Sequence, residues 1–312
     1  SSTTSSAKSI HTKAPLPMIK TQTGTAKMID FIFGVTDTQH WHLINLAQHR
    51  DHYSMLGLFG SGIVSKVQDS WGAGVYFNPY VTVNGLIIKY GVVNVDTLCT
   101  DLSQWESLYL AGRLQKPVKI LRDNPRVRLA NQFNLISALR TALLLLPSEF
   151  TEIELYSTIT SISYTGDPRM ILPAENPLKV ANIVRNNLPN FRQLYSPLLK
   201  DLPNIFFRIF KSENTNWFSD SQTNHYLAQD MDPQVRGGMI RRLPMSLRSK
   251  LFSRFQKKYQ ISQLEYDEIY ESFIDEDINK TRKWECGDFE RRIANESLDE
   301  LRSKIRGVIQ ST

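Results

Sequence analysis

The chain has 312 residues, of which 41% are hydrophobic and 22% charged, a composition that supports a sizeable core and excludes an intrinsically disordered chain. Its 37 Lys and Arg against 31 Asp and Glu give a net charge of +6, which favours a polyanionic partner such as a nucleotide, a nucleic acid or an acidic lipid. Two distant cysteines, Cys99 and Cys286, exclude a disulfide framework, and the longest apolar run, residues 142–147, is too short to span a bilayer.

The first part of the chain contains the patterns of a β-sheet. Residues 1–27 are rich in Ser, Thr and Lys and are expected to form a flexible loop or a trimmed N-terminal segment. Residues 28–35 form an apolar run broken only by Asp30, which predicts a buried strand that carries a functional group. Residues 72–93 predict two strands joined by a tight turn, because Asn84-Gly85 between β-rich runs is a strong hairpin signal.

The rest of the chain is predicted to be mostly helical. Periodic apolar residues predict one helix over residues 96–114, ended by Gly112, and another over residues 125–148. Residues 126–211 are expected to form a smaller helical domain. Residues 212–312 are expected to be a linker, polar as far as residue 234, followed by a basic C-terminal region.

Four charged residues could carry chemistry. An acid in an apolar strand is costly unless it is paired or binds a metal, so Asp30 is either a metal-binding carboxylate or a strand-end partner of Lys27. Lys89 interrupts the second strand of the hairpin and either holds a triphosphate or faces solvent. Arg113 and Lys116 lie beside a helix end, where cations contact phosphate or cap the helix dipole.

Two further patterns carry little weight alone. Gly60-Ser-Gly62 and Gly72-Ala-Gly74 look like nucleotide loops, but both lack the Gly-Lys-Ser/Thr ending of a P-loop. Four histidines fall within residues 40–52, yet the flanking sequence is helical and no cysteine or paired acid completes a zinc ligand set. A zinc site is therefore disfavoured.

Several distinctive strings occur together along residues 28–200. They are Ile29-Asp-Phe-Ile-Phe-Gly-Val35, Trp41-His42, His52-Tyr-Ser54, Gly72-Ala-Gly-Val-Tyr-Phe-Asn78, Lys89-Tyr-Gly-Val92, Leu108-Tyr-Leu-Ala-Gly-Arg-Leu-Gln-Lys-Pro-Val118, Ser163-Tyr-Thr-Gly-Asp-Pro-Arg169 and Glu175-Asn-Pro-Leu-Lys-Val-Ala-Asn-Ile-Val184. Together these strings resemble the mitochondrial translocator assembly and maintenance family, whose members are matrix-side phosphatidate cytidylyltransferases.

The resemblance implies an α/β (α+β) fold, with a nucleotidyltransferase-fold mixed sheet flanked by helices in residues 28–125, a smaller helical winged-helix-like domain in residues 126–211 and a basic C-terminal segment. It implies synthesis of CDP-diacylglycerol and pyrophosphate from CTP and phosphatidic acid, the first step toward phosphatidylglycerol and cardiolipin in mitochondria. It also implies a peripheral protein on the matrix side of the inner membrane, bound to an anionic lipid surface. A non-catalytic mitochondrial import or assembly factor is the alternative, and the apolar helices disfavour a nucleic-acid partner.

The resemblance also implies site residues. Asp30 would hold Mg²⁺ at the CTP phosphates, and Lys89 would be the second catalytic residue. The remaining substrate contacts would be Gly72, Gly74, Asn78, Tyr90, Gly91, Arg113 and Lys116. The chain departs from the family pattern because no Gly-Ser-Gly loop precedes Asp30 and because position 32 is Ile rather than a second acid. The second metal carboxylate is therefore expected at Asp101, with Asp96 as the alternative.

The most basic stretch, residues 236–258, holds eight cations and no acid. From Ser246 on, its apolar residues recur at helical spacing, which predicts either an interfacial helix on anionic lipid or a helix packed on the second domain. The residues predicted to meet the membrane are Arg241, Arg242, Leu247, Arg248, Leu251, Phe252, Arg254 and Phe255.

Overall fold

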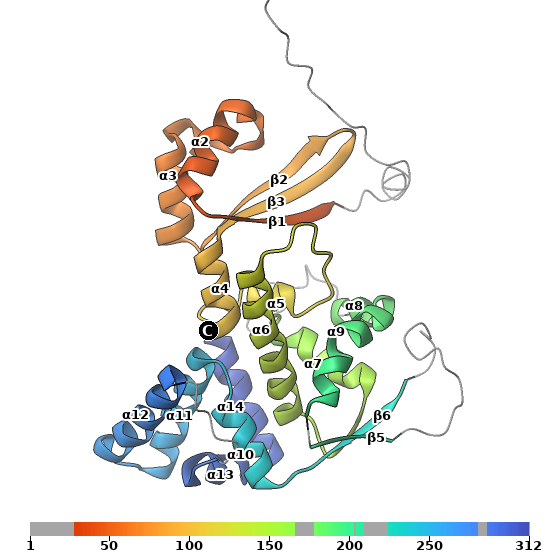
Figure 1. Ribbon diagram of the computed structural model, residues 1–312, viewed down its shortest axis with the longest axis vertical. Coiled ribbons are helices and arrows are strands. Elements are labelled where there is room, and N and C mark those ends of the chain that lie inside the picture. The colour runs from red at the N-terminus through yellow and green to blue at the C-terminus, as the bar shows by residue number, and fades with distance from the viewer. Residues whose placement is uncertain (1–27, 166–177, 203, 209–223, 280–285, 312) are drawn as a thin grey trace, which may run out of the picture. The chain divides into compact units, whose positions relative to one another are not determined.

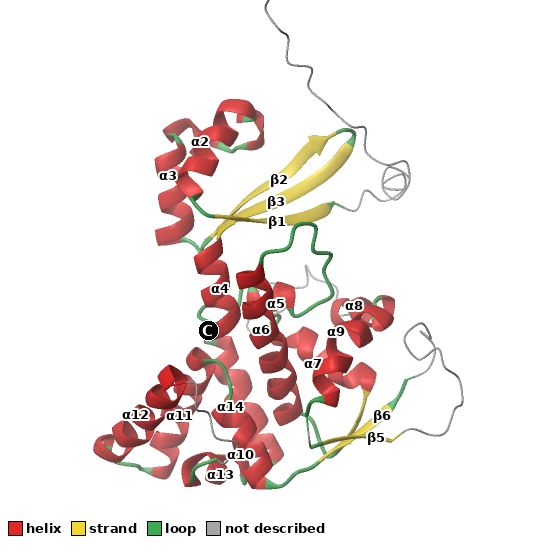
Figure 2. Ribbon diagram, viewed as in Figure 1, coloured by secondary structure: helices red, strands yellow, loops and turns green. Residues whose placement is uncertain are grey.

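The computed structural model describes residues 28–165, 178–202, 204–208, 224–279 and 286–311. These residues form a mixed α/β structure with two small sheets and many helices (Figures 1 and 2). The chain divides into two compact units, residues 1–98 and 99–312, so that the boundary expected after residue 125 lies inside the second unit. The predicted N-terminal loop lies outside the described residues, as do residues 166–177 of the family strings.

The sheet of the first unit has the strand order β1-β3-β2. β1 (Ile29–Val35) pairs in parallel with β3 (Leu86–Asn94), and β3 pairs antiparallel with β2 (Val75–Val83). The predicted hairpin is confirmed. Asn84 and Gly85 join β2 to β3 with φ angles of 51° and 79°, the left-handed conformation that a tight hairpin turn favours.

Strand β1 is less buried than its apolar sequence predicted. It lies at the edge of the sheet and pairs only with β3 among the described residues. Asp30, Phe33 and Gly34 are exposed. An apolar run has the same pattern in an edge strand as in a central one, so the expectation of a buried acid in this strand is wrong.

Short helices cover one face of this sheet. They are α2 (Thr38–Gln48), η1 (Arg50–His52), η2 (Met55–Phe59), α3 (Ser61–Lys66) and the π-helical turn η3 (Val67–Trp71). Asp37 caps α2 by accepting a hydrogen bond from the backbone N–H of His40 at 2.8 Å. Trp41 of α2 packs against the buried side chains of Tyr90 and Val92, which closes this face of the sheet.

Helix α6 (Pro125–Leu145) is the longest helix of the second unit (Figure 1). Around it lie α5 (Ala111–Leu114), α7 (Glu152–Ile162) and α9 (Leu188–Lys200), and α8 (Lys179–Asn186) packs on α7. The Asn124 side chain caps α6 by accepting hydrogen bonds from the first backbone N–H groups, and Pro125 suits the first helical position. This helix confirms the prediction for residues 125–148 to within three residues.

The helix predicted over residues 96–114 is interrupted. Helix α4 (Val95–Gln104) contains the boundary between the two units and ends ten residues earlier than predicted. Trp105 and Leu108 then adopt left-handed φ angles of 58° and 57° before α5 begins. Gly112 lies inside α5 and does not end a helix. The sequence did not reveal this break, because Trp105 and Leu108 are both buried and so continue the apolar spacing of the helix.

A small antiparallel sheet in the second unit has the order β4-β6-β5. Its strands are β4 (Glu149–Thr151), β5 (Ile205–Arg208) and β6 (Tyr226–Gln229). β6 lies in the stretch expected to be a linker, so that expectation is wrong for residues 226–229, whereas residues 212–223 lie outside the described part. Strands of three or four residues are too short for an alternating pattern to be recognised.

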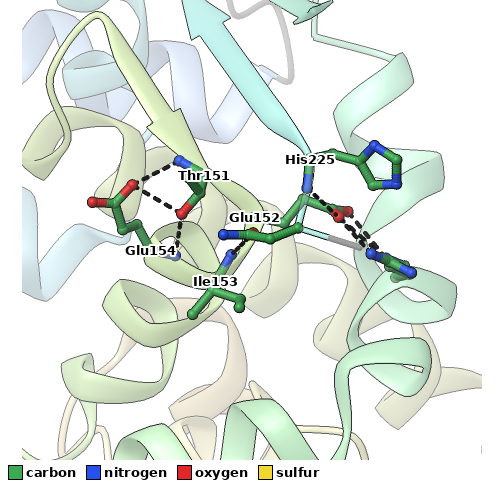
Figure 3. A network of polar contacts seen from close by, with 7 residues as sticks. Thr151, Glu152, Ile153, Glu154 and His225 are labelled. Atoms are coloured by element: carbon green, nitrogen blue, oxygen red, sulfur yellow. Dashed lines mark hydrogen bonds and ion pairs between the residues drawn. The ribbon is translucent and has the colours of Figure 1, made fainter. Parts of the chain in front are cut away.

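Polar contacts at the start of α7 connect that helix to the small sheet (Figure 3). Thr151 and Glu154 form a capping box, in which each side chain accepts a hydrogen bond from the other's backbone N–H. Between them, Glu152 donates its backbone N–H to the carbonyl of His225 at 2.9 Å. Its carboxylate pairs with Arg192 at 2.8 Å, and both side chains are fully buried. Breaking such a pair costs about 3–5 kcal/mol, so it holds α7 against α9.

The region expected to be basic and C-terminal is helical where the structure describes it. The helices are α10 (Pro233–Arg241), α11 (Met245–Tyr259), α12 (Gln263–Asn279), α13 (Asp288–Ala294) and α14 (Leu298–Gln310). Within the described ranges, no helix is both long enough and apolar enough to cross a membrane.

Helix α11 is packed into the core, so the predicted interfacial helix is wrong. Four of its apolar side chains are at most 1% exposed: Leu247, Leu251, Phe252 and Phe255. Three of the predicted lipid-binding arginines are buried as well. Arg241 pairs with Glu290 at 2.7 Å, whereas Arg242 and Arg248 donate to backbone carbonyls at 3.0 and 2.6 Å. An amphipathic helix has the same sequence pattern whether its apolar face meets lipid or a protein core.

Candidate functional site

An acid and a lysine lie on neighbouring strands, on the sheet face opposite the covering helices. In the parallel pairing of β1 with β3, Asp30 stands opposite Lys89. Side chains of paired residues point to the same face, and neighbouring strands are about 4.8 Å apart. Asp30 is exposed and forms no hydrogen bond or ion pair within the described residues. Its carboxylate is therefore available to a ligand. The alternative partner, Lys27, lies outside the described residues.

Lys89 is supported by an aromatic ring. Its ammonium lies 4.4 Å from the ring centroid of Phe77, within the range of a cation–π contact. Phe77 stands opposite Gly91 in the β2–β3 pairing, and a Cβ on Gly91 would lie 2.6 Å from the ring. Gly91 therefore makes room for the ring on which Lys89 rests. Gly91 thus positions Lys89 indirectly, through the ring of Phe77.

Tyr90 and Asn78 lie on the covered face of the sheet. They are 3% and 1% exposed. The Tyr90 hydroxyl accepts a hydrogen bond from Asn45 Nδ2 at 2.9 Å and lies 2.9 Å from Nδ1 of His52. Burial raises the pKa of Tyr90, so its hydroxyl stays protonated at neutral pH. The contacts of Tyr90 tie the helices to the sheet, and contact of Tyr90 or Asn78 with substrate stays a prediction.

The clustered histidines have different surroundings. His42 is buried, with Nδ1 2.8 Å from the Tyr53 hydroxyl and Nε2 2.9 Å from Oε1 of Gln68. Burial lowers the pKa of His42, and both of its ring nitrogens are occupied, so it is a structural residue. Three other side chains can bring one ligand atom each to within 4.8 Å of one another: His49, Asp51 and His52. Asp51 is an acid that the sequence argument against a ligand set overlooked.

The predicted glycine contacts, Gly72 and Gly74, lie in the turn that leads into β2. Gly74 has a φ of +73°, and a Cβ there would lie 2.6 Å from Cγ2 of Thr97. The backbone of this turn therefore requires glycine at position 74. Contact of either glycine with substrate stays a prediction.

Asp101 is a structural residue and not a metal ligand. It is 4% exposed, and its carboxylate is saturated by five donors. Oδ1 accepts from the backbone N–H and hydroxyl of Ser107 and from the N–H of Leu108, at 2.9–3.0 Å. Oδ2 accepts from the N–H groups of Leu110 and Ala111, both at 2.9 Å. The carboxylate thus fixes the turn between α4 and α5, and the predicted metal role is wrong.

Two lysines flank Tyr164 in the second unit, and a third cation, Arg113, lies near one of them. Lys116 and Lys179 lie 5.2 and 5.1 Å from the centroid of its ring, and Arg113 is close enough to affect Lys116. The Lys116 ammonium donates to Oγ of Ser163 at 2.9 Å. Burial, together with the charges of Arg113 and Lys179, lowers the pKa of Lys116 to about 8. Cations that disfavour one another's charge in this way are stabilised by a bound anion.

The sequence analysis predicted two members of this cluster and missed Lys179 and Tyr164. Both belong to family strings that were recognised without a role being given to single residues in them. Lys179 is the first residue of α8, and Tyr164 follows the end of α7. The signal that could have found Lys179 is its position just after Asn-Pro, where a helix starts.

Comparison with known proteins identifies the family. A family model described as "Phosphatidate cytidylyltransferase, mitochondrial" matches residues 4–312. The chain belongs to this family. It is 46% identical over 222 residues to the mitochondrial phosphatidate cytidylyltransferase of Schizosaccharomyces pombe, an alignment that covers 70% of this chain and 56% of that protein.

Other relatives carry the same name. The mouse (Mus musculus) mitochondrial phosphatidate cytidylyltransferase is 40% identical over 226 residues, covering 72% of this chain and 63% of that protein. The Xenopus laevis protein is 50% identical over 179 residues, covering 57% of this chain and 53% of that protein. The chain therefore spans about half the length of the mitochondrial phosphatidate cytidylyltransferases that it matches.

Proposed function

We propose that the chain transfers a cytidylyl group from CTP to phosphatidic acid, which yields CDP-diacylglycerol and pyrophosphate. Family membership supports this activity. The structural observation that carries the proposal is the exposed carboxylate of Asp30, which has no partner among the described residues and stands opposite Lys89 on two paired strands. An oxygen ligand beside a cation suits a nucleoside triphosphate and its divalent ion.

The fold proposed for this activity has two parts. For the first unit we propose a nucleotidyltransferase fold, supported by a mixed sheet with helices on one face. For residues 126–211 we propose a winged-helix-like arrangement. Its support is a set of helices together with strands of a small antiparallel sheet, in which β5 pairs with β6.

We propose Mg²⁺ as the cofactor, with Asp30 as its protein ligand. Mg²⁺ usually takes one or two carboxylates and completes its shell with water and substrate phosphates, so a single exposed carboxylate fits. Asp96, exposed in the first turn of α4, is the second candidate, since Asp101 is saturated. When bound, the ion would polarise phosphate oxygens of CTP.

The cations have separate tasks in the proposed reaction. Lys89 in the first unit would hold a phosphate of CTP as a point charge. Within the second unit, the cluster of Arg113, Lys116 and Lys179 would neutralise the charge of a bound phosphate group. A phosphatidate oxygen attacks the α-phosphorus, and the bond from that phosphorus to the pyrophosphate oxygen breaks. No general base is needed, because a phosphate monoester is already anionic at neutral pH.

The proposal includes a place in the cell. We propose a peripheral protein on the matrix side of the mitochondrial inner membrane, where CDP-diacylglycerol would lead to phosphatidylglycerol and cardiolipin. Phosphatidic acid resides in a bilayer, so an anionic lipid surface is a required partner. Because the apolar face of α11 is packed in the core, that contact cannot use Leu247, Leu251, Phe252 or Phe255.

Pyrophosphate release tests the proposal. The full chain is incubated with CTP and phosphatidate in mixed micelles, with and without Mg²⁺, and CDP-diacylglycerol is identified by mass spectrometry. We expect equal amounts of the two products, formed only when CTP, phosphatidate and Mg²⁺ are all present. Controls replace CTP by UTP or phosphatidate by phosphatidylcholine. Absence of CDP-diacylglycerol from a folded sample would overturn the proposed activity.

A further inference from the structure

A cleft of about 620 Å³ is lined by residues of α11 and α14 in the second unit. Its walls are polar. Arg254 of α11 and Arg302 and Arg306 of α14 supply three positive charges, and Asp299 supplies the one acid. In the described part of the chain no large apolar side chain lines the cleft, so it suits a small charged group rather than an acyl chain or a nucleobase.

The arginines at the back of the cleft are held in place. Arg254 donates Nη2–H to the carbonyl oxygen of Gly307 at 2.7 Å, and a Cβ at position 307 would lie 2.3 Å from Nη1 of the same guanidinium. The guanidinium of Arg254 can therefore occupy this position against α14 only when residue 307 is glycine. Arg302 donates Nε–H to the carbonyl oxygen of Leu145 at 2.6 Å, which satisfies one carbonyl at the end of α6.

Among the described residues that line the cleft, the positive charges outnumber the negative ones. Arg302 and Arg306 are one helical turn apart, and like charges at this spacing destabilise a helix by about 0.2–0.5 kcal/mol. Arg306 is exposed and has no hydrogen bond or ion pair within the described residues. Asp299 is 94% exposed and lies 3.4 Å from Arg302. Behind the cleft, burial and the charge of Arg302 lower the pKa of Arg236 to about 10.

We propose that this α11–α14 cleft binds a phosphate group. A planar guanidinium presents paired N–H donors that match phosphate oxygens, and an anion would relieve the repulsion between the arginines. The phosphate belongs either to the headgroup of an anionic phospholipid or to a soluble phosphate compound, because both offer the same oxygens. The inference does not depend on the proposed activity, since these residues have no part in that reaction.

Binding of inorganic phosphate to the full chain tests the site. Titration calorimetry at constant ionic strength compares the wild type with Arg306→Gln and with Gly307→Ala, which would displace the Arg254 guanidinium. Lys257→Gln removes an exposed cation of α11 outside the cleft and is the charge-matched control. We expect Arg306→Gln to weaken phosphate binding about fivefold, the equivalent of about 1 kcal/mol per cation, and Gly307→Ala to weaken it as well. Lys257→Gln should bind like the wild type.

Vesicle sedimentation then distinguishes the two sources of phosphate. Phosphatidylcholine vesicles with and without phosphatidate are mixed with the same proteins. Weaker sedimentation of Arg306→Gln with phosphatidate vesicles assigns the cleft to a lipid headgroup, whereas unchanged sedimentation with weakened phosphate binding assigns it to a soluble compound. The proposal is overturned if Arg306→Gln binds phosphate as the wild type does, or if Lys257→Gln loses as much affinity as Arg306→Gln.

Discussion

Replacement of Lys116 by Met tests the electrostatic description of the cationic cluster. In the folded protein the pKa of Lys116 is lowered from 10.5 to about 8, so below pH 8 both the folded and the unfolded chain carry its proton. Between pH 8 and 10.5 the folded state has lost that proton and the unfolded state keeps it. Stability therefore rises with pH through this window, because the unfolded state binds more protons.

The size of the rise follows from the interval between the two pKa values. At about 1.36 kcal/mol per pH unit, the interval from 8 to 10.5 corresponds to at most about 3 kcal/mol. We expect the free energy of unfolding of the wild type, minus that of Lys116→Met, to rise by up to this amount between the two pH values. The difference removes contributions from other groups that titrate in both proteins.

The assay is urea unfolding at a series of pH values, followed by circular dichroism. Lys119→Met, which removes an exposed lysine three residues away, serves as the control and should follow the wild type. Bound pyrophosphate should raise the pKa of Lys116 and move the rise in stability to higher pH. Parallel pH curves for the wild type and Lys116→Met would refute the reasoning, since they would mean that Lys116 has the same pKa in both states.

Two further substitutions separate the exposed carboxylate from the buried one. Asp30→Asn keeps the side-chain shape but removes the charge. Turnover in the CTP assay should therefore fall by much more than about tenfold, and the melting temperature should stay unchanged. Near-normal Mg²⁺-dependent turnover would remove Asp30 from the site. Asp101→Asn should instead lower stability in urea by about 3 kcal/mol or more, because its NH₂ group would face backbone N–H donors. A variant as stable as the wild type would contradict the structural role of Asp101.

Local signals in the sequence predicted the parts of the fold that depend on neighbouring residues. The hairpin follows from Asn84-Gly85, whose left-handed turn is fixed by two residues, and α6 follows from its cap and its apolar period. Asp30 and Lys89 were singled out because charges interrupt apolar strands, and their role in a site stays a prediction. That they stand opposite each other depends on the pairing of β1 with β3, which one strand's sequence does not specify.

The failures share a physical cause, namely that the deciding partner lies elsewhere in the chain. Asp101 has the sequence of a free helix carboxylate, yet it is occupied by the N–H groups of a turn six to ten residues later. Helix α11 has a basic amphipathic pattern, and α14 packs against it in place of lipid. Lys179 joins Lys116 only because α8 packs against α7. Such partners are set by packing, which periodicity does not encode.

The connectivity of the first sheet sets an order in which Asp30 and Lys89 can be brought opposite each other. The β2–β3 hairpin closes through a two-residue turn. Pairing of β1 with β3, in contrast, closes a loop that contains residues 36–85. Closing the longer loop costs more chain entropy, so the hairpin is expected to form first and β1 to dock last and detach first. Native-state hydrogen exchange would then show smaller opening energies for amides of β1 than for those of β2, and the reverse order would contradict this. Mild denaturant would thus separate Asp30 from Lys89 while the hairpin is still folded, and the proposed activity would be lost before the hairpin unfolds.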